Sequence, residues 1–319
     1  MEWANVRAPA RLHLGFIAER AGALGSAAIA IEEPYLLLDI RKSGEIKAYG
    51  DYSTEFEQLA ERLLSSFVQG NGAEIWVKRA IKRHVGLGSG TRMAMAVGTA
   101  LSYLYRIDIN PYRIAEFFGR GRNSKAGLET LLHGGMAVVN SSGQGINTAL
   151  PEDWRFIVAI PEIEHGFFGE KERKAMDSMG MPVVGEDIRD SIMDALSSED
   201  IELFGRLLTE LDEGTGAMFT HVQPGTHTFS LLDKIKEIGL KKGALGAGQS
   251  SWGPALYFLS DSDKAERIAS SIEEYILRNG GGEVFVSKAA DKGIEIFEYE
   301  ENIYETHGIG ESHRILYKS

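Results

Sequence analysis

The sequence predicts an α+β protein of two domains. The first part of the chain runs from strands through a glycine-rich turn into a helix, whereas the C-terminal part follows the order helix, strand, strand, helix, strand, which is most of a split βαβ or ferredoxin-like unit. The 319 residues, 43% hydrophobic and 25% charged, suit a globular chain of one large or two smaller domains. Pro151 marks the expected boundary, which gives domains of residues 1–150 and 151–319.

Hydrophobic periodicity predicts the elements of the first domain. Ala27 to Ile40 is apolar and β-branched and reads as a strand. Glu55 to Val68 has the spacing of an amphipathic helix, and Ala73 to Ile81 returns to a strand pattern. After a glycine-rich turn at Gly86 to Gly90, the apolar residues from Thr91 onward recur on one helical face.

The remaining elements are predicted from the same two periodicities. Strands are expected at 134–139 and 154–160, on either side of a polar turn at 140–147, and later at 243–245, 254–259 and 283–287. Helices are expected at 171–179, 186–196, 201–211, 227–238 and 263–277.

Charge and composition exclude several classes of protein. The chain carries 34 Lys and Arg against 46 Asp and Glu, a net charge of −12, which repels nucleic acids and anionic membranes. It has no cysteine, which excludes disulfides, thiolate metal sites and cysteine nucleophiles. We find no signal peptide and no apolar stretch of the roughly 20 residues that a membrane span needs. We expect a soluble cytoplasmic protein that acts on small molecules, and we leave its oligomeric state open, a homodimer included.

The sharpest local signal is the turn from His84 to Arg92, His-Val-Gly-Leu-Gly-Ser-Gly-Thr-Arg, which runs directly into a helix. Glycine lets the main chain approach a ligand, and the first turn of a helix offers unpaired N–H donors and a partial positive charge. We therefore predict that phosphate binds to Gly86, Leu87, Gly88, Ser89, Gly90 and Thr91. The spacing matches neither a Walker loop nor a dinucleotide fingerprint, and a tight turn capped by Thr91 is the structural alternative.

Two segments place cations where an anionic substrate could bind. The run from Gly119 to Gly127 holds Arg120, Arg122 and Ser124, which concentrates positive potential in an acidic protein, although a solvated loop would explain it too. Arg11 and His13 alternate with apolar residues, so both point to one face of a strand. Arginine suits carboxylate or phosphate and histidine suits acid–base work, while a half-buried structural histidine is the alternative.

A second glycine cluster contains Gly246, Gly248, Gln249 and Ser250 and connects two predicted strands. Such a loop can approach a substrate closely, and a bulged connection is the equally simple alternative. Glu170 opens a predicted helix after the segment 165–169 and is a candidate carboxylate near the domain junction, although an acidic first turn also suits the helix dipole.

The histidines are scattered, so we expect no transition-metal site. We expect Mg²⁺ to enter with a phosphate ligand, since it then needs few protein carboxylates.

Three of these segments resemble, in order, the motifs of the GHMP superfamily of galactokinase, homoserine kinase, mevalonate kinase and phosphomevalonate kinase. Ala8-Pro9-Ala10-Arg11 is similar to its first motif, Gly86 to Gly90 to its phosphate loop and Gly246 to Gly248 to its third motif. The resemblance implies an N-terminal domain like ribosomal protein S5 domain 2 and a ferredoxin-like C-terminal domain.

Within that superfamily, the chain most resembles the archaeal β-ribofuranosylaminobenzene 5'-phosphate synthases. The similar segments are 11–16, 84–91, 119–122, 133–135, 169–173 and 248–254. The resemblance implies that phosphoribosyl pyrophosphate and 4-aminobenzoate are joined between ribose C1 and the ring, with loss of carbon dioxide and pyrophosphate, at the start of tetrahydromethanopterin synthesis.

One position separates this family from the kinases that it resembles. Kinases such as mevalonate kinase place a catalytic Asp shortly before a Gly-Gly pair, where it orients or deprotonates the acceptor hydroxyl. Counting back from Gly134 and Gly135, that place falls at or near Gly127, and the nearest carboxylate is Glu129. The resemblance therefore implies a scaffold that no longer phosphorylates.

The resemblance also suggests roles for the candidate residues. The main chain of the glycine turn would bind pyrophosphate, and Arg120 and Arg122 would hold pyrophosphate or the 5'-phosphate. Arg11 with His13 would hold the benzoate carboxylate and Glu170 would face the ribose cation, while His133 is a further catalytic candidate.

The chain departs from the family pattern at 123–127 and at Leu132, where Glu is expected before His-Gly-Gly. An ATP-dependent small-molecule kinase of the same superfamily and a non-catalytic protein that binds a phosphorylated metabolite are the two alternatives.

Overall fold

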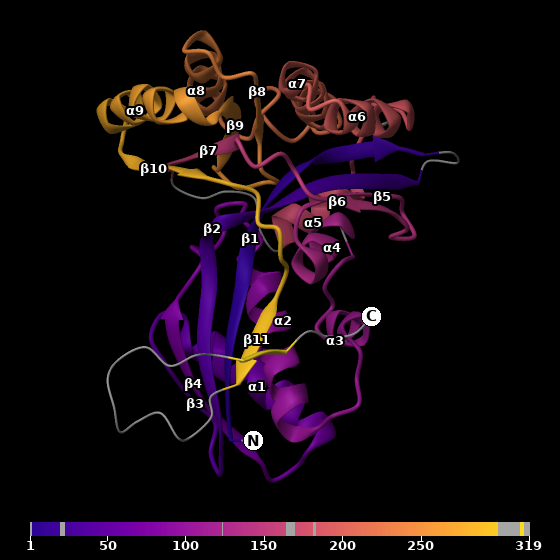
Figure 1. Cartoon of the computed structure of the whole chain (residues 1–319), viewed down its shortest axis with the longest axis vertical. Helices are drawn as coiled ribbons and strands as arrows, with labels where there is room; N and C mark the ends of the chain where they lie inside the picture. Colours follow the sequence, from indigo (N-terminus) through magenta and orange to yellow (C-terminus); the bar gives the residue numbers. More distant parts are fainter. Residues whose placement is uncertain are drawn as a thin grey trace.

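A computed structural model describes residues 2–19, 23–122, 124–163, 170–180, 183–298 and 313–315. Its lower part is built on a sheet with the strand order β12-β11-β1-β2-β4-β3, to which β5 and β6 attach through β2 (Figure 1). The strands are β1 (Trp3–Ala18), β2 (Leu24–Ser43), β3 (Lys47–Tyr49), β4 (Gly72–Arg79), β5 (Met136–Val139), β6 (Gly145–Thr148), β11 (Glu295–Glu298) and β12 (His313–Ile315).

The long antiparallel pair β1 and β2 carries the chain from this sheet up to the second domain (Figure 1). Alternate residues of β1, among them Val6, Ala8, Ala10 and Leu12, are fully buried, because a strand turns every second side chain to one face. Four helices accompany this sheet: α1 (Ser53–Phe67), α2 (Ser89–Tyr105), α3 (Pro111–Phe117) and α4 (Ala126–His133).

The upper domain is ferredoxin-like, as predicted. Its antiparallel sheet has the order β10-β7-β9-β8, so the strands, numbered along the chain within this domain, lie in the order fourth, first, third, second. The strands are β7 (Trp154–Pro161), β8 (Gly246–Gln249), β9 (Leu256–Asp261) and β10 (Gly282–Ser287). The helices are α5 (Glu170–Asp177), α6 (Asp187–Ser197), α7 (Ile201–Ala217), α8 (Ser230–Lys241) and α9 (Ser262–Arg278).

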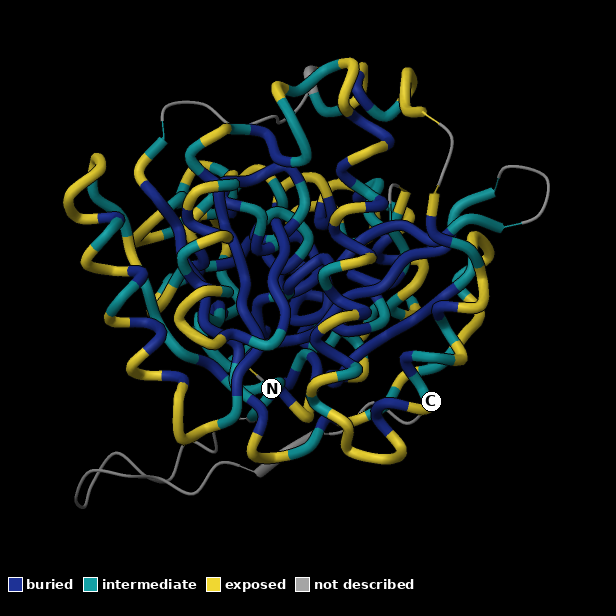
Figure 2. Tube along the Cα trace, turned by 90° about the horizontal axis from the view of Figure 1, so that it is seen from above, coloured by how far each residue is buried: buried dark blue, intermediate teal, exposed yellow. Residues whose placement is uncertain are grey.

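Strand β7 lies between two cores. Ile157 and Ala159 pack with α8 and α9, whereas Phe156 and Val158 face the larger core that continues into the first domain. In Figure 2 the buried chain is concentrated in the middle of the molecule and the exposed residues lie on the outer turns of the peripheral helices. The larger of these two cores is therefore shared by both domains.

Some predicted boundaries are wrong. The strand expected at 243–245 lies at Gly246–Gln249, so the second glycine cluster is itself a strand followed by a short turn, and β6 begins inside the turn expected at 140–147. The two-domain division at residue 150 does not hold for β11 and β12. Val6 of β1 pairs with Ile296 of β11, and β11 pairs with β12, so both strands belong to the sheet of the first domain. The segment after β10 thus returns to the first sheet.

Candidate active site

A cavity of about 300 Å³ lies where the two domains meet. It is lined by residues of β1, the first turn of α2, the segments 119–122 and 124–128, α5, α7, the segment 219–226, and the end of β8 with the turn after it. Of the predicted site residues, the cavity brings together Arg11, His13, Thr91, Arg120, Arg122, Ser124 and Gln249.

Two guanidinium groups line the cavity where β1 meets α2, that of Arg92 buried and that of Arg11 half-buried. The Arg11 group donates to the carbonyl oxygen of Gly86 (2.8 Å), and the Arg92 group donates to the carbonyl oxygens of Pro9 (2.9 Å) and Gly127 (3.1 Å). Burial lowers the pKa of Arg11 to about 10, against the charge of Glu172. Burial, and then the charge of Arg11, lower the pKa of Arg92. An anionic ligand would offset the unfavourable burial of these charges.

Arg120 brings a further cation to the start of α2. A Cβ atom on Gly90, in the first turn of that helix, would lie 3.4 Å from Nη1 of Arg120. Burial, followed by the charges of Arg83 and Arg62, lowers the pKa of Arg120. Its buried Nε has no hydrogen-bond partner within the described chain. The helix N-terminus and this guanidinium therefore point at one place, which suits a phosphate group.

The glycine turn only partly matches its predicted role. Helix α2 begins at Ser89 behind Gly88 (φ 76°), two residues before the expected cap at Thr91, and without a capping side chain. Thr91 lines the cavity, whereas Leu87 is buried in the core. Gly86 has φ 95°, and a Cβ there would lie 2.1 Å from the carbonyl oxygen of Ser250. Gly86 therefore serves the packing of the turn against the second domain.

Ser250 joins three segments of the site. Its Oγ accepts the His13 N–H (2.9 Å) and donates to the carbonyl oxygen of Gly86 (2.8 Å). Gly246 and Gly248 are not substrate contacts, because a Cβ would lie 2.2 Å from the oxygen of Gly205 and 2.4 Å from the Tyr257 hydroxyl, respectively. They let β8 approach its neighbours closely, and neither lines the cavity.

Aromatic side chains line a further part of the cavity, which we call its aromatic end. The His13 ring meets Phe16 edge to face (4.9 Å between centroids), Phe16 lies 6.4 Å from Phe219, and Phe219 meets Trp252 at 4.4 Å. Met176 packs against the same cluster. Such a surface favours an aromatic ring over a flexible polar chain.

The burial of His13 favours the neutral form of its imidazole. Burial lowers its pKa to about 3, and the charge of Arg11 acts in the same direction. Its buried Nδ1 has no partner in the part of the chain that the structure describes. The ring can therefore offer a hydrogen bond to a bound ligand.

The burial of His13 predicts a pH-dependent stability. In the unfolded chain His13 binds a proton below a pKa of about 6.5, whereas in the folded protein it binds one only below a pKa of about 3. The free energy of unfolding therefore falls as the pH falls from about 6.5 to about 3. Between pH 7 and pH 5 the free energy of unfolding should drop by about 2 kcal/mol more in the parent protein than in His13→Asn. Urea unfolding of both proteins at pH 7 and pH 5 measures this difference. An equal change in the free energy of unfolding in the two proteins would contradict the prediction.

Two predicted catalytic residues lie away from the cavity. Glu170 is exposed at the start of α5 and pairs with Lys174 (3.0 Å), whereas Glu172, two residues on, lines the cavity. His133 ends α4, is half-exposed and pairs with Glu129 (3.5 Å) without lining the cavity. The structure therefore does not bring either of these predicted catalytic residues to the cavity. Asn123 and the segment 165–169 lie outside the described residues.

Ser124 and Gln249, two predicted substrate contacts, both line the cavity. The Ser124 hydroxyl donates to Oγ of Ser26 (3.0 Å). The Gln249 amide donates to Oγ1 of Thr228 (2.7 Å) and to the carbonyl oxygen of Gly253 (2.8 Å), which fixes its orientation.

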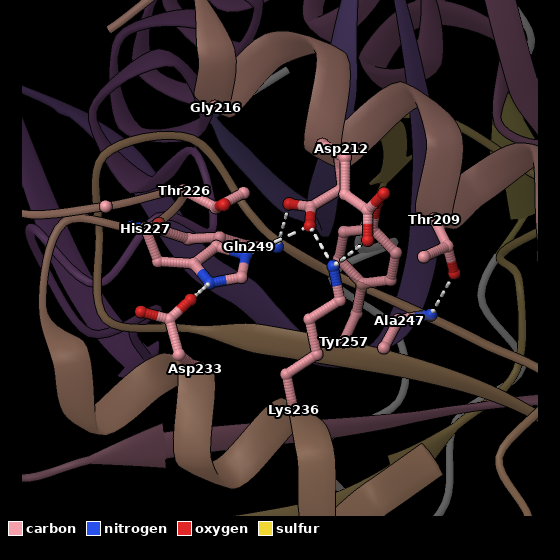
Figure 3. A network of polar contacts seen from close by, with 12 residues as sticks. Thr209, Asp212, Gly216, Thr226, His227, Asp233, Lys236, Ala247, Gln249 and Tyr257 are labelled. Atoms are coloured by element: carbon pink, nitrogen blue, oxygen red, sulfur yellow. Dashed lines mark hydrogen bonds and ion pairs between the residues drawn. The ribbon is translucent and has the colours of Figure 1, made fainter. Parts of the chain in front are cut away.

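Sequence reasoning missed Asp212 (Figure 3). This aspartate lines the cavity from α7 and is only 4% exposed. Its Oδ2 accepts from Nε2 of His227 (2.9 Å) and Nζ of Lys236 (2.8 Å), and its Oδ1 accepts from the Gln249 N–H (2.7 Å). Burial opposes the charged form, but His227 and Lys236 outweigh it and hold the pKa of Asp212 below its usual range.

The described residues contain no group of three His, Asp or Glu side chains that could hold a metal ion. No described helix is long and apolar enough to span a membrane.

Two arginines surround Gly127, the place where the related kinases are expected to carry a catalytic Asp. The Gly127 carbonyl accepts from Arg92, and a Cβ on Gly127 would lie 3.4 Å from Nε of Arg11. Glu129, the nearest carboxylate in sequence, instead pairs with His133. Among the described residues, no carboxylate stands at Gly127 to act as a base for phosphoryl transfer.

Comparison with known proteins identifies the family. The family models for the GHMP kinases N terminal domain and the GHMP kinases C terminal domain match residues 54–138 and 192–276. A β-ribofuranosylphenol 5'-phosphate synthase from Archaeoglobus fulgidus is 30% identical, with 92% of this chain and 99% of the relative covered. The chain belongs to the GHMP kinase superfamily and to this synthase family. A synthase of the same name from Methanothermobacter thermautotrophicus is 26% identical, covering 90% of this chain and 97% of the relative.

Solved structures of the GHMP superfamily share the fold. Lactococcus lactis galactokinase matches with a TM-score of 0.71 at 13% identity, over 92% of this chain and 95% of the galactokinase. Homoserine kinase from Cytophaga hutchinsonii matches with a TM-score of 0.68 at 18% identity, over 93% of this chain and 98% of the homoserine kinase. The predicted GHMP architecture is confirmed.

Proposed function

We propose that the protein transfers the 5-phosphoribosyl group of phosphoribosyl pyrophosphate to the ring of an aromatic acid, with release of pyrophosphate and carbon dioxide. One observation carries this proposal: a single cavity combines a wall of arginines at a helix N-terminus with an aromatic end. The first feature suits a diphosphate and the second suits an aromatic acceptor. The arginines around Gly127 favour ribosyl transfer over phosphoryl transfer.

The names of the relatives support an aromatic acceptor. Those names contain phenol, whereas the resemblance found in the sequence implied an aminobenzene product. A ribosylated phenol forms by loss of carbon dioxide if the acceptor is 4-hydroxybenzoate. We therefore place 4-hydroxybenzoate first and 4-aminobenzoate second as acceptors. A role in tetrahydromethanopterin synthesis and a homodimeric assembly stay predictions.

Each part of the cavity has a role under this proposal. The first turn of α2, with Thr91 and Arg120, holds the diphosphate, and Arg122 holds the 5'-phosphate. Arg11 neutralises the benzoate carboxylate beside His13. Mg²⁺ enters bound to the diphosphate, because a phosphate-bound Mg²⁺ needs few protein carboxylates. Glu172 also lines the cavity, and its charge acts on Arg11.

An assay of both products tests the proposal. Purified protein is incubated with Mg²⁺, phosphoribosyl pyrophosphate and carboxyl-labelled 4-hydroxybenzoate or 4-aminobenzoate. We expect labelled carbon dioxide and pyrophosphate in equal amounts, and neither product with unsubstituted benzoate. ATP consumption that depends on an alcohol, without carbon dioxide, would instead show a kinase. Tight binding of phosphoribosyl pyrophosphate without turnover with either acceptor would show a binding protein.

A further inference from the structure

Asp212 lies on the same side of the cavity as part of the aromatic end. Asp212, Thr215 and Gly216 follow the three- and four-residue spacing of one helical face of α7, and Phe219 continues that face just beyond the helix. All four line the cavity. The carboxylate therefore lies along the same wall as Phe219, which belongs to the aromatic cluster.

The carboxylate is held in place and kept charged. His227 and Lys236 both donate to Oδ2, and the far nitrogen of His227 contacts Oδ1 of Asp233 at 2.6 Å (Figure 3). Oδ1 of Asp212 is bonded to one N–H, that of Gln249, and a carboxylate oxygen can accept more than one hydrogen bond. A carboxylate whose pKa is held below its usual range accepts hydrogen bonds and resists protonation.

We propose that Asp212 determines which aromatic acid the site accepts, by accepting a hydrogen bond from a donor group para to the carboxylate of the acceptor. This inference rests on the proposed function. The arginines of the cavity attract the acceptor carboxylate, whereas Oδ1 of Asp212 accepts hydrogen bonds and repels another carboxylate oxygen, so one direction of the ring is favoured. The ring carbon that carries the carboxylate then lies toward the diphosphate, where ribose C1 must be.

The same hydrogen bond assists the reaction. As the ring carbon attacks ribose C1, the bond from C1 to the diphosphate breaks and its electron pair leaves with pyrophosphate. The ring draws electron density from its para oxygen, which becomes more positive. The hydrogen bond that the hydroxyl donates to Asp212 therefore strengthens. The bond to the carboxylate then breaks, carbon dioxide leaves, and its electron pair restores the aromatic ring and the hydroxyl. The hydroxyl proton stays on its oxygen throughout.

Ligand binding to the parent protein tests the inference without a variant. Calorimetric titration in saturating Mg²⁺ and pyrophosphate compares 4-hydroxybenzoate, 4-fluorobenzoate and terephthalate. Fluorine is similar in size to a hydroxyl but donates no hydrogen bond, and terephthalate carries a second carboxylate. We expect 4-hydroxybenzoate to bind at least about tenfold more tightly than 4-fluorobenzoate, the range of a hydrogen bond to a charged group, and terephthalate to bind most weakly.

The substitution Asp212→Asn should invert part of this order. Loss of the charge removes the repulsion, so terephthalate should bind about tenfold more tightly than to the parent protein, while the preference for 4-hydroxybenzoate over 4-fluorobenzoate shrinks. A purely structural role would weaken all ligands alike. The matched control is Glu213→Gln, which removes the same charge from the adjacent residue, whose side chain is 61% exposed and also pairs with Lys236.

The outcomes separate this inference from the proposed function. If the parent protein releases carbon dioxide from 4-hydroxybenzoate but binds it no better than 4-fluorobenzoate, the role of Asp212 is wrong and the proposed function stands. If neither benzoate binds and no carbon dioxide forms, the proposed function itself fails. Should Asp212→Asn not fold, the ligand series on the parent protein still decides the question. An unchanged order of ligands in a folded Asp212→Asn would overturn the inference.

Discussion

Replacing Arg120 by alanine is expected to lower kcat/KM for phosphoribosyl pyrophosphate by about 100-fold, which corresponds to about 2.7 kcal/mol of transition-state stabilisation. The guanidinium lies over the first turn of α2 and its buried Nε has no partner in the described structure, so its charge is available to the departing diphosphate. Steady-state kinetics with 4-hydroxybenzoate as acceptor measure the loss.

The variant should remain folded. The contact of Arg120 that fixes the local chain is its main-chain N–H, which donates to the carbonyl oxygen of Ala115 (2.7 Å), and alanine keeps it. Arg113→Ala is the matched control, because Arg113 is exposed and pairs with Glu116 on the surface. Equal activities of Arg120→Ala and Arg113→Ala would show that the diphosphate binds elsewhere.

Gly86→Ala is expected to destabilise the protein by about 3 kcal/mol. A side chain is strained at φ 95°, and the added Cβ would lie 2.1 Å from the carbonyl oxygen of Ser250, which belongs to the main chain and cannot move aside easily. The expected loss combines the strain of left-handed backbone with overpacking at the domain junction. Chemical unfolding of both proteins measures it from the midpoint and slope.

Gly90→Ala, four residues on, is the informative comparison. Gly90 has no positive φ, and the nearest atom to an added Cβ is the mobile end of Arg120 at 3.4 Å. Stability should therefore be unchanged or slightly higher, while pyrophosphate binds about tenfold more weakly, because the methyl group intrudes between the helix N–H groups and Arg120. If Gly86→Ala is neutral, or Gly90→Ala binds pyrophosphate normally, the two glycines do not have these separate roles.

Local patterns predicted much of the fold. The ferredoxin-like domain follows from helices and strands whose periodicities are visible in short windows, and it agrees with the order β10-β7-β9-β8. The return of β11 to β1 was not predictable, since it joins Val6 to Ile296 and nothing in either segment specifies so distant a partner. Pairings of high sequence separation depend on the assembled protein.

The candidate site was predicted where short motifs fix its geometry. Strand alternation placed Arg11 and His13 together, and both reach the cavity. The sequence pattern pointed to Glu170, but Glu172 is the glutamate at the cavity. Residues two apart on a helix point about 200° apart, so Glu172 faces the cavity and Glu170 faces the solvent.

Asp212 was not predictable, because its partners His227 and Lys236 lie on a later segment that only the folded chain brings near. Gly246 and Gly248 were mistaken for ligand contacts, because a glycine needed for packing looks the same in sequence as one that approaches a substrate.

The central claim is that the arginine-lined start of α2 binds a ribosyl diphosphate in a site without a phosphoryl-transfer base. Thermal unfolding in Mg²⁺ with phosphoribosyl pyrophosphate, compared with Mg²⁺ and ATP, tests it most directly. At a hundred times its Kd, a ligand that binds only the folded protein adds about 2.7 kcal/mol of stability. Phosphoribosyl pyrophosphate should raise the Tm of the parent protein and fail to raise that of Arg120→Ala, with little effect of ATP on either. A larger rise with ATP, and none with phosphoribosyl pyrophosphate, would contradict the claim.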